Sequence, residues 1–105
     1  MSIQTDIKKH ALEAYPNECV GYVAKGKYHR LENVSNTPTE RYQLLNKDKL
    51  MLFKLGKDLQ ALVHSHPVMD NEPSEADLGA KEATGFTFWI IGTDGKNTTE
   101  IKEID

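Results

Sequence analysis

Residues 59–67 read LQALVHSHP, a mostly apolar run that passes directly into two histidines and a proline. A run of this length predicts a buried strand. In a strand, residues two apart point to the same face of the sheet, so the imidazoles of His64 and His66 reach toward one point. The stretch therefore predicts a strand whose end carries two possible metal ligands.

The rest of the chain predicts helices and strands on both sides of this stretch. Downstream, Ser74 opens a helix that Gly85 ends, and the almost wholly apolar residues 86–91 are typical of a strand buried on both faces. Further strands are predicted at residues 19–24, 28–34, 42–45 and 98–104. Further helices are predicted at residues 3–14, capped by Ser2 or Thr5 and ended by Pro16, and at residues 50–55, ended by Gly56. The expected fold class is a single α/β domain over residues 1–105, with a central mixed sheet flanked by helices.

Length and composition exclude several classes of protein. The chain has 105 residues, enough for one domain, and its net charge of −3 is spread along the sequence without a basic face for nucleic acid. The single cysteine, Cys19, excludes an internal disulfide and fits a reducing compartment. Residues 1–10 lack the apolar core of a signal peptide, and no apolar run approaches the ~20 residues that span a bilayer. We expect a soluble, cytoplasmic protein that binds neither nucleic acid nor membrane.

Asp77 is the best third ligand for a metal bound by the two histidines. It lies in the first turn of the helix that follows the loop 68–73, and this loop is long enough to fold the helix start back over the strand end. The positive end of the helix dipole keeps such a carboxylate ionised. Two neutral imidazoles and one carboxylate, with water in the fourth position, are the ligands of catalytic zinc. The sequence therefore predicts a Zn²⁺ site at His64, His66 and Asp77.

A hydrolytic zinc site also needs a base, because zinc lowers the pKa of its water only to roughly 7. Glu18 is the candidate, at the junction between a helix end and a strand start. A carboxylate there can take a proton from the water and deliver it to a leaving amine. Ser74 offers a hydroxyl suited to stabilising the oxyanion of a tetrahedral intermediate.

Each of these residues also has a purely structural interpretation. Ser74 and Asp77 have the spacing of a helix N-cap and its capping-box partner, although a capping serine can still present its hydroxyl to a site. Glu18 alone is typical of a solvated loop acid, and Cys19 of a small buried strand residue rather than a nucleophile. His10 and His29 have no partner at ligand spacing and are expected at the surface. The joint occurrence of the ligand set at this spacing favours the metal site.

The residues resemble a known pattern. Glu18, then His-Ser-His-Pro from residue 64, seven residues, Ser74, two residues and Asp77 resemble the JAMM motif of the MPN metallopeptidase family. The resemblance extends from Ile3 to the end of the chain. It implies that the two histidines and Asp77 bind zinc, that Glu18 is general base and acid, and that Ser74 helps to hold the oxyanion. Family members hydrolyse peptide or isopeptide bonds, often next to the C-terminus of ubiquitin or a ubiquitin-like protein.

The length of the chain narrows the choice among the branches of this family. The chain has no room for the insertions that bind ubiquitin in eukaryotic deubiquitinating members, so it resembles a minimal prokaryotic or phage-type member. Residues 18–21 are similar to the N-terminal domain of lambda K-like tail assembly proteins, where a cysteine-peptidase half of the NlpC/P60 kind follows. Another minimal branch processes sulfur-carrier proteins with ubiquitin-like folds. The implied partners are a protein or peptide-tail substrate, ubiquitin-like or otherwise, and an NlpC/P60-type or tail-protein partner.

Two other functions compete with a zinc metallopeptidase. One is a weakly active or inactive MPN-fold assembly and binding module, which would have no need of Glu18 and Ser74 together with the three ligands. The other is a mononuclear iron oxygenase, whose facial triad is also two histidines and a carboxylate. Such iron sites usually lie in all-β barrels, whereas this sequence has helical segments on both sides of the motif.

Overall fold

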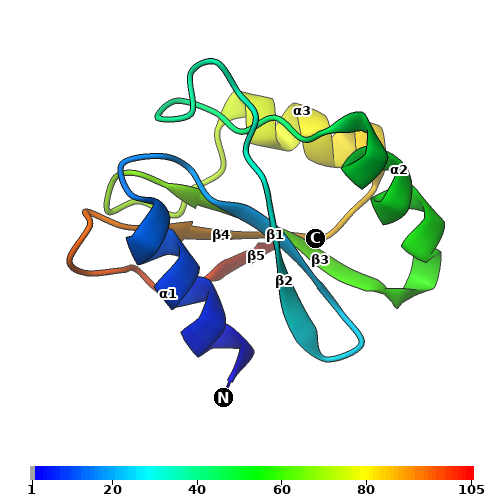
Figure 1. The fold of residues 1–105 in the computed structure, drawn as a ribbon, viewed down its shortest axis with the longest axis horizontal. Helices are drawn as coiled ribbons and strands as arrows, with labels where there is room; N and C mark the ends of the chain where they lie inside the picture. The colour runs from blue at the N-terminus through cyan, green and yellow to red at the C-terminus, as the bar shows by residue number, and fades with distance from the viewer. Residues whose placement is uncertain (1) are drawn as a thin grey trace.

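The chain folds into a five-stranded mixed sheet with helices on both faces (Figure 1). This computed structural model describes residues 2–105. The strands are β1 (Val20–Ala24), β2 (Lys27–Leu31), β3 (Leu59–His66), β4 (Phe88–Gly92) and β5 (Lys102–Ile104), in the order β2-β1-β3-β4-β5 across the sheet. The helices are α1 (Ile3–Ala14), α2 (Asn46–Leu55) and α3 (Glu75–Thr84), with a 3-10 turn, η1 (Gly56–Asp58), before β3. The predicted α/β fold class is confirmed.

Strand β3 lies at the centre of the sheet. It pairs antiparallel with β1 and parallel with β4, and helix α3 makes the crossover that a parallel pair requires. The hairpin from β1 to β2 turns through Lys25 and Gly26, both at positive φ, which is the backbone of a tight hairpin turn. The two predicted ligands at the end of β3 therefore lie between two neighbouring strands.

The two faces of the sheet carry separate hydrophobic clusters. Ile7 and Ala11 of α1 pack with Val63 on one face, and Leu52 of α2 packs with Leu62 on the other. Figure 1 shows α1 on one side of the sheet and both α2 and α3 on the opposite side. Because side chains alternate along β3, the residues two and four places beyond Leu62 point to the α2–α3 face.

Local sequence signals decide where two of the helices begin and end. Ser2, and not Thr5, caps α1, since the Ser2 side chain accepts a hydrogen bond from the Thr5 N–H. Ser74 caps α3, and Gly85 ends it in the left-handed conformation that glycine adopts without steric cost.

No helix within residues 2–105 is both long and apolar enough to cross a bilayer.

Several sequence-based expectations about local structure were wrong. The strand predicted at 28–34 ends at Leu31, and the helix predicted at 50–55 already begins at Asn46. Residues 42–45 form no strand, because the backbone around Gln43 bonds to Asn33 and Val34 in an irregular loop. The predicted edge strand at 98–104 is reduced to β5 and one bridge between Thr93 and Thr98. His10 is partly buried, and its Nδ1 lies 2.6 Å from the Tyr28 hydroxyl, whereas His29 is exposed as expected.

Candidate metal centre

His64, His66 and Asp77 converge at the C-terminal end of β3. The two imidazole rings lie on the same face of the strand, with their centroids 5.2 Å apart. The carboxylate of Asp77 lies between them, with Oδ1 3.0 Å from His64 Nε2 and Oδ2 3.0 Å from His66 Nε2. One possible ligand atom from each residue lies within 4.8 Å of the other two, so the group can bind a single metal ion. The structure thus brings the three predicted ligands together.

His64 is fully buried, and neither of its ring nitrogens has a hydrogen-bond partner. The short approach of Asp77 to Nε2 does not have hydrogen-bond geometry. Within residues 2–105, these two nitrogens are the buried side-chain polar atoms without a hydrogen bond. Leaving such an atom unpaired costs roughly 1–3 kcal/mol, so an unpaired imidazole nitrogen beside a carboxylate and a second imidazole fits a metal ligand.

His66 is oriented by the backbone of the loop that follows β3. Its Nδ1 lies 3.2 Å from the carbonyl oxygen of Asp70. A carbonyl can only accept, so this contact places a proton on Nδ1 and leaves Nε2 to face Asp77. When the ring is protonated, Nε2 also donates to Asp77, which raises the pKa of His66, and burial opposes this rise. In the loop, Asn71 donates to the backbone oxygen of Glu100, 2.8 Å away, which ties the loop to the β4–β5 connection.

Asp77 has two roles at the start of α3. In a capping box, its Oδ2 accepts from the Ser74 N–H at 2.9 Å, and Ser74 Oγ accepts from the Asp77 N–H at 3.1 Å. Burial by itself would raise the pKa of Asp77, but the imidazoles of His64 and His66 and the Ser74 N–H hold it well below its usual range. The carboxylate is therefore ionised wherever the protein is folded at neutral pH. The capping interpretation and the metal-ligand geometry occur together.

Glu18 reaches the same face through the pairing of β1 with β3. Val20 lies opposite His64 in this antiparallel pair, and continuing the register by two residues places Glu18 opposite His66. The side chain is buried, with 8% of the residue exposed. Burial raises the pKa of Glu18 to about 7, with a smaller lowering by His66 and a raising by Asp77. A carboxyl with this pKa can accept and release a proton near neutral pH.

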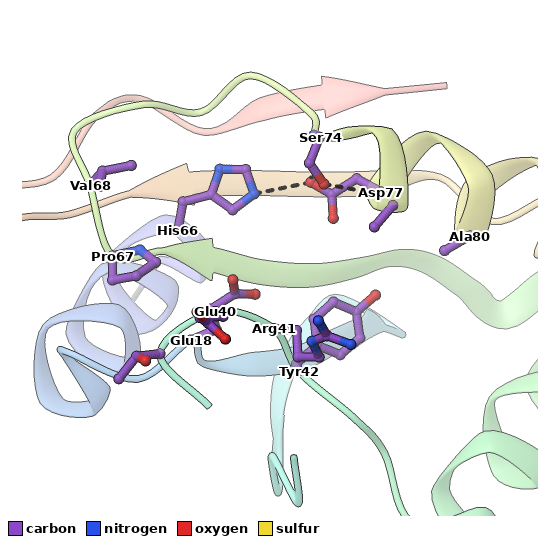
Figure 2. Close-up of a pocket in the computed structure, with 12 residues that line it drawn as sticks. Glu18, Glu40, Arg41, Tyr42, His66, Pro67, Val68, Ser74, Asp77 and Ala80 are labelled. Carbon is purple, nitrogen blue, oxygen red and sulfur yellow. Dashed lines mark hydrogen bonds and ion pairs between the residues drawn. The ribbon is translucent and has the colours of Figure 1, made fainter. Parts of the chain in front are cut away.

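A pocket of about 500 Å³ lies over these groups. Figure 2 shows His66, Ser74 and Asp77 along one side and Glu18 and Tyr42 along the other. Pro67, Val68, Ala76 and Ala80 add apolar surface, and Glu40 and Arg41 add charge. All five residues singled out from the sequence therefore lie at or beside one pocket. The catalytic roles assigned to Glu18 and Ser74 stay predictions.

Sequence reasoning missed the residues that the irregular loop brings to the site. The ring centroids of Tyr42 and His64 lie 4.9 Å apart, and Tyr42 lines the pocket. Asn33 donates to the backbone oxygen of Glu18 at 2.9 Å. The sequence pattern predicts strands at 28–34 and 42–45, which include both residues, whereas both act from a segment without regular structure.

The raised pKa of Glu18 gives a pH-dependent stability prediction. The pKa rises from 4.5 to about 7 on folding, so the neutral carboxyl contributes stability that is complete below pH 4.5 and lost as the pH rises through about 7. Glutamine mimics the neutral form at every pH. In the metal-free protein, Glu18→Gln is expected to be neutral near pH 4.5 and stabilising by about 3 kcal/mol at pH 8. Urea denaturation at both pH values measures this, and a difference that does not grow with pH would contradict it.

Sequence comparison identifies relatives over nearly the whole chain. The family described as prokaryotic homologs of the JAB domain matches residues 2–104. The tail tip assembly protein K of Escherichia phage N15 is 36% identical over an alignment of 89 residues that covers 81% of this chain. The match covers 36% of that protein, so this chain spans about a third of its length.

Solved structures share the fold. A protein from Desulfitobacterium hafniense, DSY2949, superposes with a TM-score of 0.68 at 20% identity, over 98% of this chain and 86% of that one. AF2198, a JAB1/MPN domain protein from Archaeoglobus fulgidus, gives a TM-score of 0.63 at 22% identity, over 99% and 91% of the two chains. A protein from Salinibacter ruber gives 0.56 at 27% identity, over 98% and 80%.

Proposed function

The chain belongs to the family of prokaryotic JAB-domain homologs, and from this premise we propose that residues 1–105 form a JAMM-type zinc metallopeptidase domain. His64, His66 and Asp77 would hold the zinc, and Glu18 would act as general base and acid. The substrate bond is a peptide or isopeptide bond in a protein tail. The observation that carries this proposal is the buried His64 imidazole without a hydrogen-bond partner, next to a carboxylate and a second imidazole that line the same pocket as Glu18.

A zinc ion on these ligands would supply Lewis acidity, which lowers the pKa of water and polarises a carbonyl group. Glu18 takes a proton from the attacking water and passes it to the leaving nitrogen. A pKa of about 7 suits the Glu18 carboxyl for both transfers near neutral pH. The Ser74 Oγ already accepts from the Asp77 N–H, so its own hydroxyl proton is free to donate to the oxyanion of the substrate. Each step uses a group that lies at the same pocket.

The test compares wild type with Glu18→Gln. We expect about one zinc per chain in both proteins, measured by elemental analysis, because Glu18 is not a ligand in the proposal. Cleavage of a panel of peptide-tailed proteins, including tail-protein and ubiquitin-like tails, should fall at least about 100-fold in the variant, since general bases typically contribute 10²–10⁴-fold. Glu32→Gln, at an exposed glutamate outside the pocket, is the matched control and should cleave like wild type.

The alternatives give different outcomes in the same experiment. Equal inactivity of wild type and Glu18→Gln on every tail would favour an assembly module that keeps the fold without hydrolysis. Stoichiometric iron in the purified protein would contradict zinc as the metal. Cleavage that survives in Glu18→Gln would show that Glu18 is not the base.

A role in phage tail assembly is the second proposed function. It is favoured by the relatedness to the tail tip assembly protein K of phage N15 over most of this chain. In that role the substrate or partner is a tail protein, and an NlpC/P60-type partner would act beside this domain. Processing of a ubiquitin-like sulfur carrier is the competing assignment. Cleavage of tail-protein tails alone would favour phage tail assembly, and cleavage of ubiquitin-like tails alone would favour the sulfur carrier.

A further inference from the structure

The side chain of Asn33 joins three segments of backbone next to the pocket. Its Nδ2 donates to the backbone oxygens of Glu18, at 2.9 Å, and Arg41, at 3.2 Å. Its Oδ1 accepts from the backbone N–H groups of Ser35 and Gln43, each at 3.0 Å. Both donor hydrogens and both acceptor lone pairs of the amide are therefore used. An asparagine side chain with four backbone partners fixes the relative positions of those partners.

Asn33 acts on the loop as an additional peptide group would. The amide donates to Arg41 and accepts from Gln43, and the next residue, Val34, donates its N–H to the Gln43 oxygen at 2.8 Å. These bonds resemble one rung of a strand pair, although the segment belongs to no strand. Residues 39–42 of this loop form one wall of the pocket, so Asn33 holds that wall against the sheet.

The same loop holds both backbone polar groups of Glu18. The Glu18 oxygen accepts from Asn33, and the Glu18 N–H donates to the oxygen of Pro38 at 2.7 Å. Glu18 lies between α1 and β1, next to Cys19, whose oxygen still pairs with the Ser65 N–H of β3. The β1–β3 register thus brings Glu18 opposite His66, and the two bonds from the loop fix the backbone of Glu18 itself.

We propose that Asn33 is a positioning residue, whose side-chain amide holds Glu18 in the pocket and keeps the wall at Arg41 in register with it. The catalytic part of this inference rests on the proposed peptidase function. Asn33 contacts neither the reacting atoms nor the metal ligands, so its loss should leave the ligand set intact and misplace the base. A misplacement of about 1 Å can cost about 100-fold in rate.

The test uses two variants with complementary hydrogen-bonding capacity. Asn33→Asp keeps the two bonds accepted from Ser35 and Gln43 and loses the two donated bonds, including the one to Glu18. Asn33→Ala loses all four. In the zinc-loaded enzymes we expect kcat to fall about 10–100-fold in both variants, with KM changed less than kcat and one zinc per chain retained. Asn36→Ala, at an exposed asparagine of the same loop, is the matched control and should behave like wild type.

A second readout needs neither metal nor activity. In the metal-free protein, carbon-detected NMR follows the titration of the Glu18 carboxyl. Burial raises the pKa of this carboxyl to about 7. If Asn33 holds Glu18 in the pocket, the midpoint in Asn33→Ala should move back toward the ordinary value of 4.5, because the side chain gains access to water. A loss of stability alone would leave the midpoint of the folded molecules in place.

Wild-type kcat in Asn33→Asp, or an unchanged midpoint in folded Asn33→Ala, would overturn the inference. If Asn33→Ala does not fold, Asn33→Asp alone tests the inference, which expects a lower kcat per bound zinc than in wild type. If zinc-loaded wild type cleaves nothing, the proposed function fails, and the NMR titration still tests the positioning of Glu18.

Discussion

Asp77→Asn should weaken zinc binding by more than about 1,000-fold, which corresponds to about 4 kcal/mol of binding free energy. The carboxylate is the anionic ligand of the proposed set, with one oxygen 3.0 Å from each imidazole Nε2. A neutral amide offers one weakly donating oxygen and removes the negative charge that offsets the metal's charge. Peptide cleavage should disappear with the metal. Isothermal titration of zinc into metal-free protein measures the affinity directly.

Asparagine is chosen because it separates the ligand role from the capping role. Its side-chain oxygen can still accept from the Ser74 N–H, so α3 keeps its N-terminal cap. Glu75→Gln is the matched control, since it removes a neighbouring exposed carboxylate from the first turn of the same helix and should bind zinc like wild type. Unchanged zinc affinity in Asp77→Asn would contradict the ligand assignment.

The metal-free Asp77→Asn protein should also lose stability in a defined pH range. The pKa of Asp77 is lowered on folding from its ordinary 3.8, so its pairing with the histidines contributes stability above about pH 4 and loses it as the pH falls toward the folded pKa. The stability difference between wild type and variant should therefore shrink on acidification.

Gly92→Ala should destabilise the protein by about 3 kcal/mol and weaken zinc binding at least tenfold. Gly92 ends β4 opposite His66, and the loop after β3 packs directly on its backbone. A Cβ here would lie 2.5 Å from the Asp70 nitrogen, 2.5 Å from the Val68 oxygen and 2.6 Å from the Asp70 oxygen. These are backbone atoms, so the loop itself must shift, and the Asp70 carbonyl that orients His66 shifts with it. Urea denaturation and zinc titration measure the two effects.

Gly79→Ala is the control for this substitution. Gly79 lies in α3, and a Cβ there would meet no heavy atom within 4 Å. Alanine is about 0.5–1 kcal/mol more favourable than glycine inside a helix, so this variant should be slightly more stable than wild type, with unchanged zinc affinity. If Gly92→Ala behaves like Gly79→Ala, the packing of the loop on Gly92 does not orient the site.

The predicted fold class holds because its signals are local. The apolar run before His64 gave a central strand, and the Ser74 cap and Gly85 terminator gave α3 within a residue of its observed ends. The segment at 42–45 failed as a strand because its backbone partners are the side chain of Asn33 and the backbone of Val34, which no alternation of apolar residues encodes. The edge strand predicted at 98–104 was too long because side chains bond where the strand ladder was expected: Thr99 Oγ1 accepts from the Gly92 N–H, and Asn71 donates to the Glu100 oxygen.

The sequence by itself determined the three residues that converge as candidate ligands. Strand periodicity puts His64 and His66 on one face, and helix capping puts Asp77 at the start of α3, so both facts follow from short-range geometry. Only the tertiary structure decided that Glu18 joins them. Its place depends on the register of β1 against β3, which pairs residues 35 to 44 positions apart in the sequence. The same holds for Asn33, whose four bonds close an irregular loop and leave no periodic trace in the sequence.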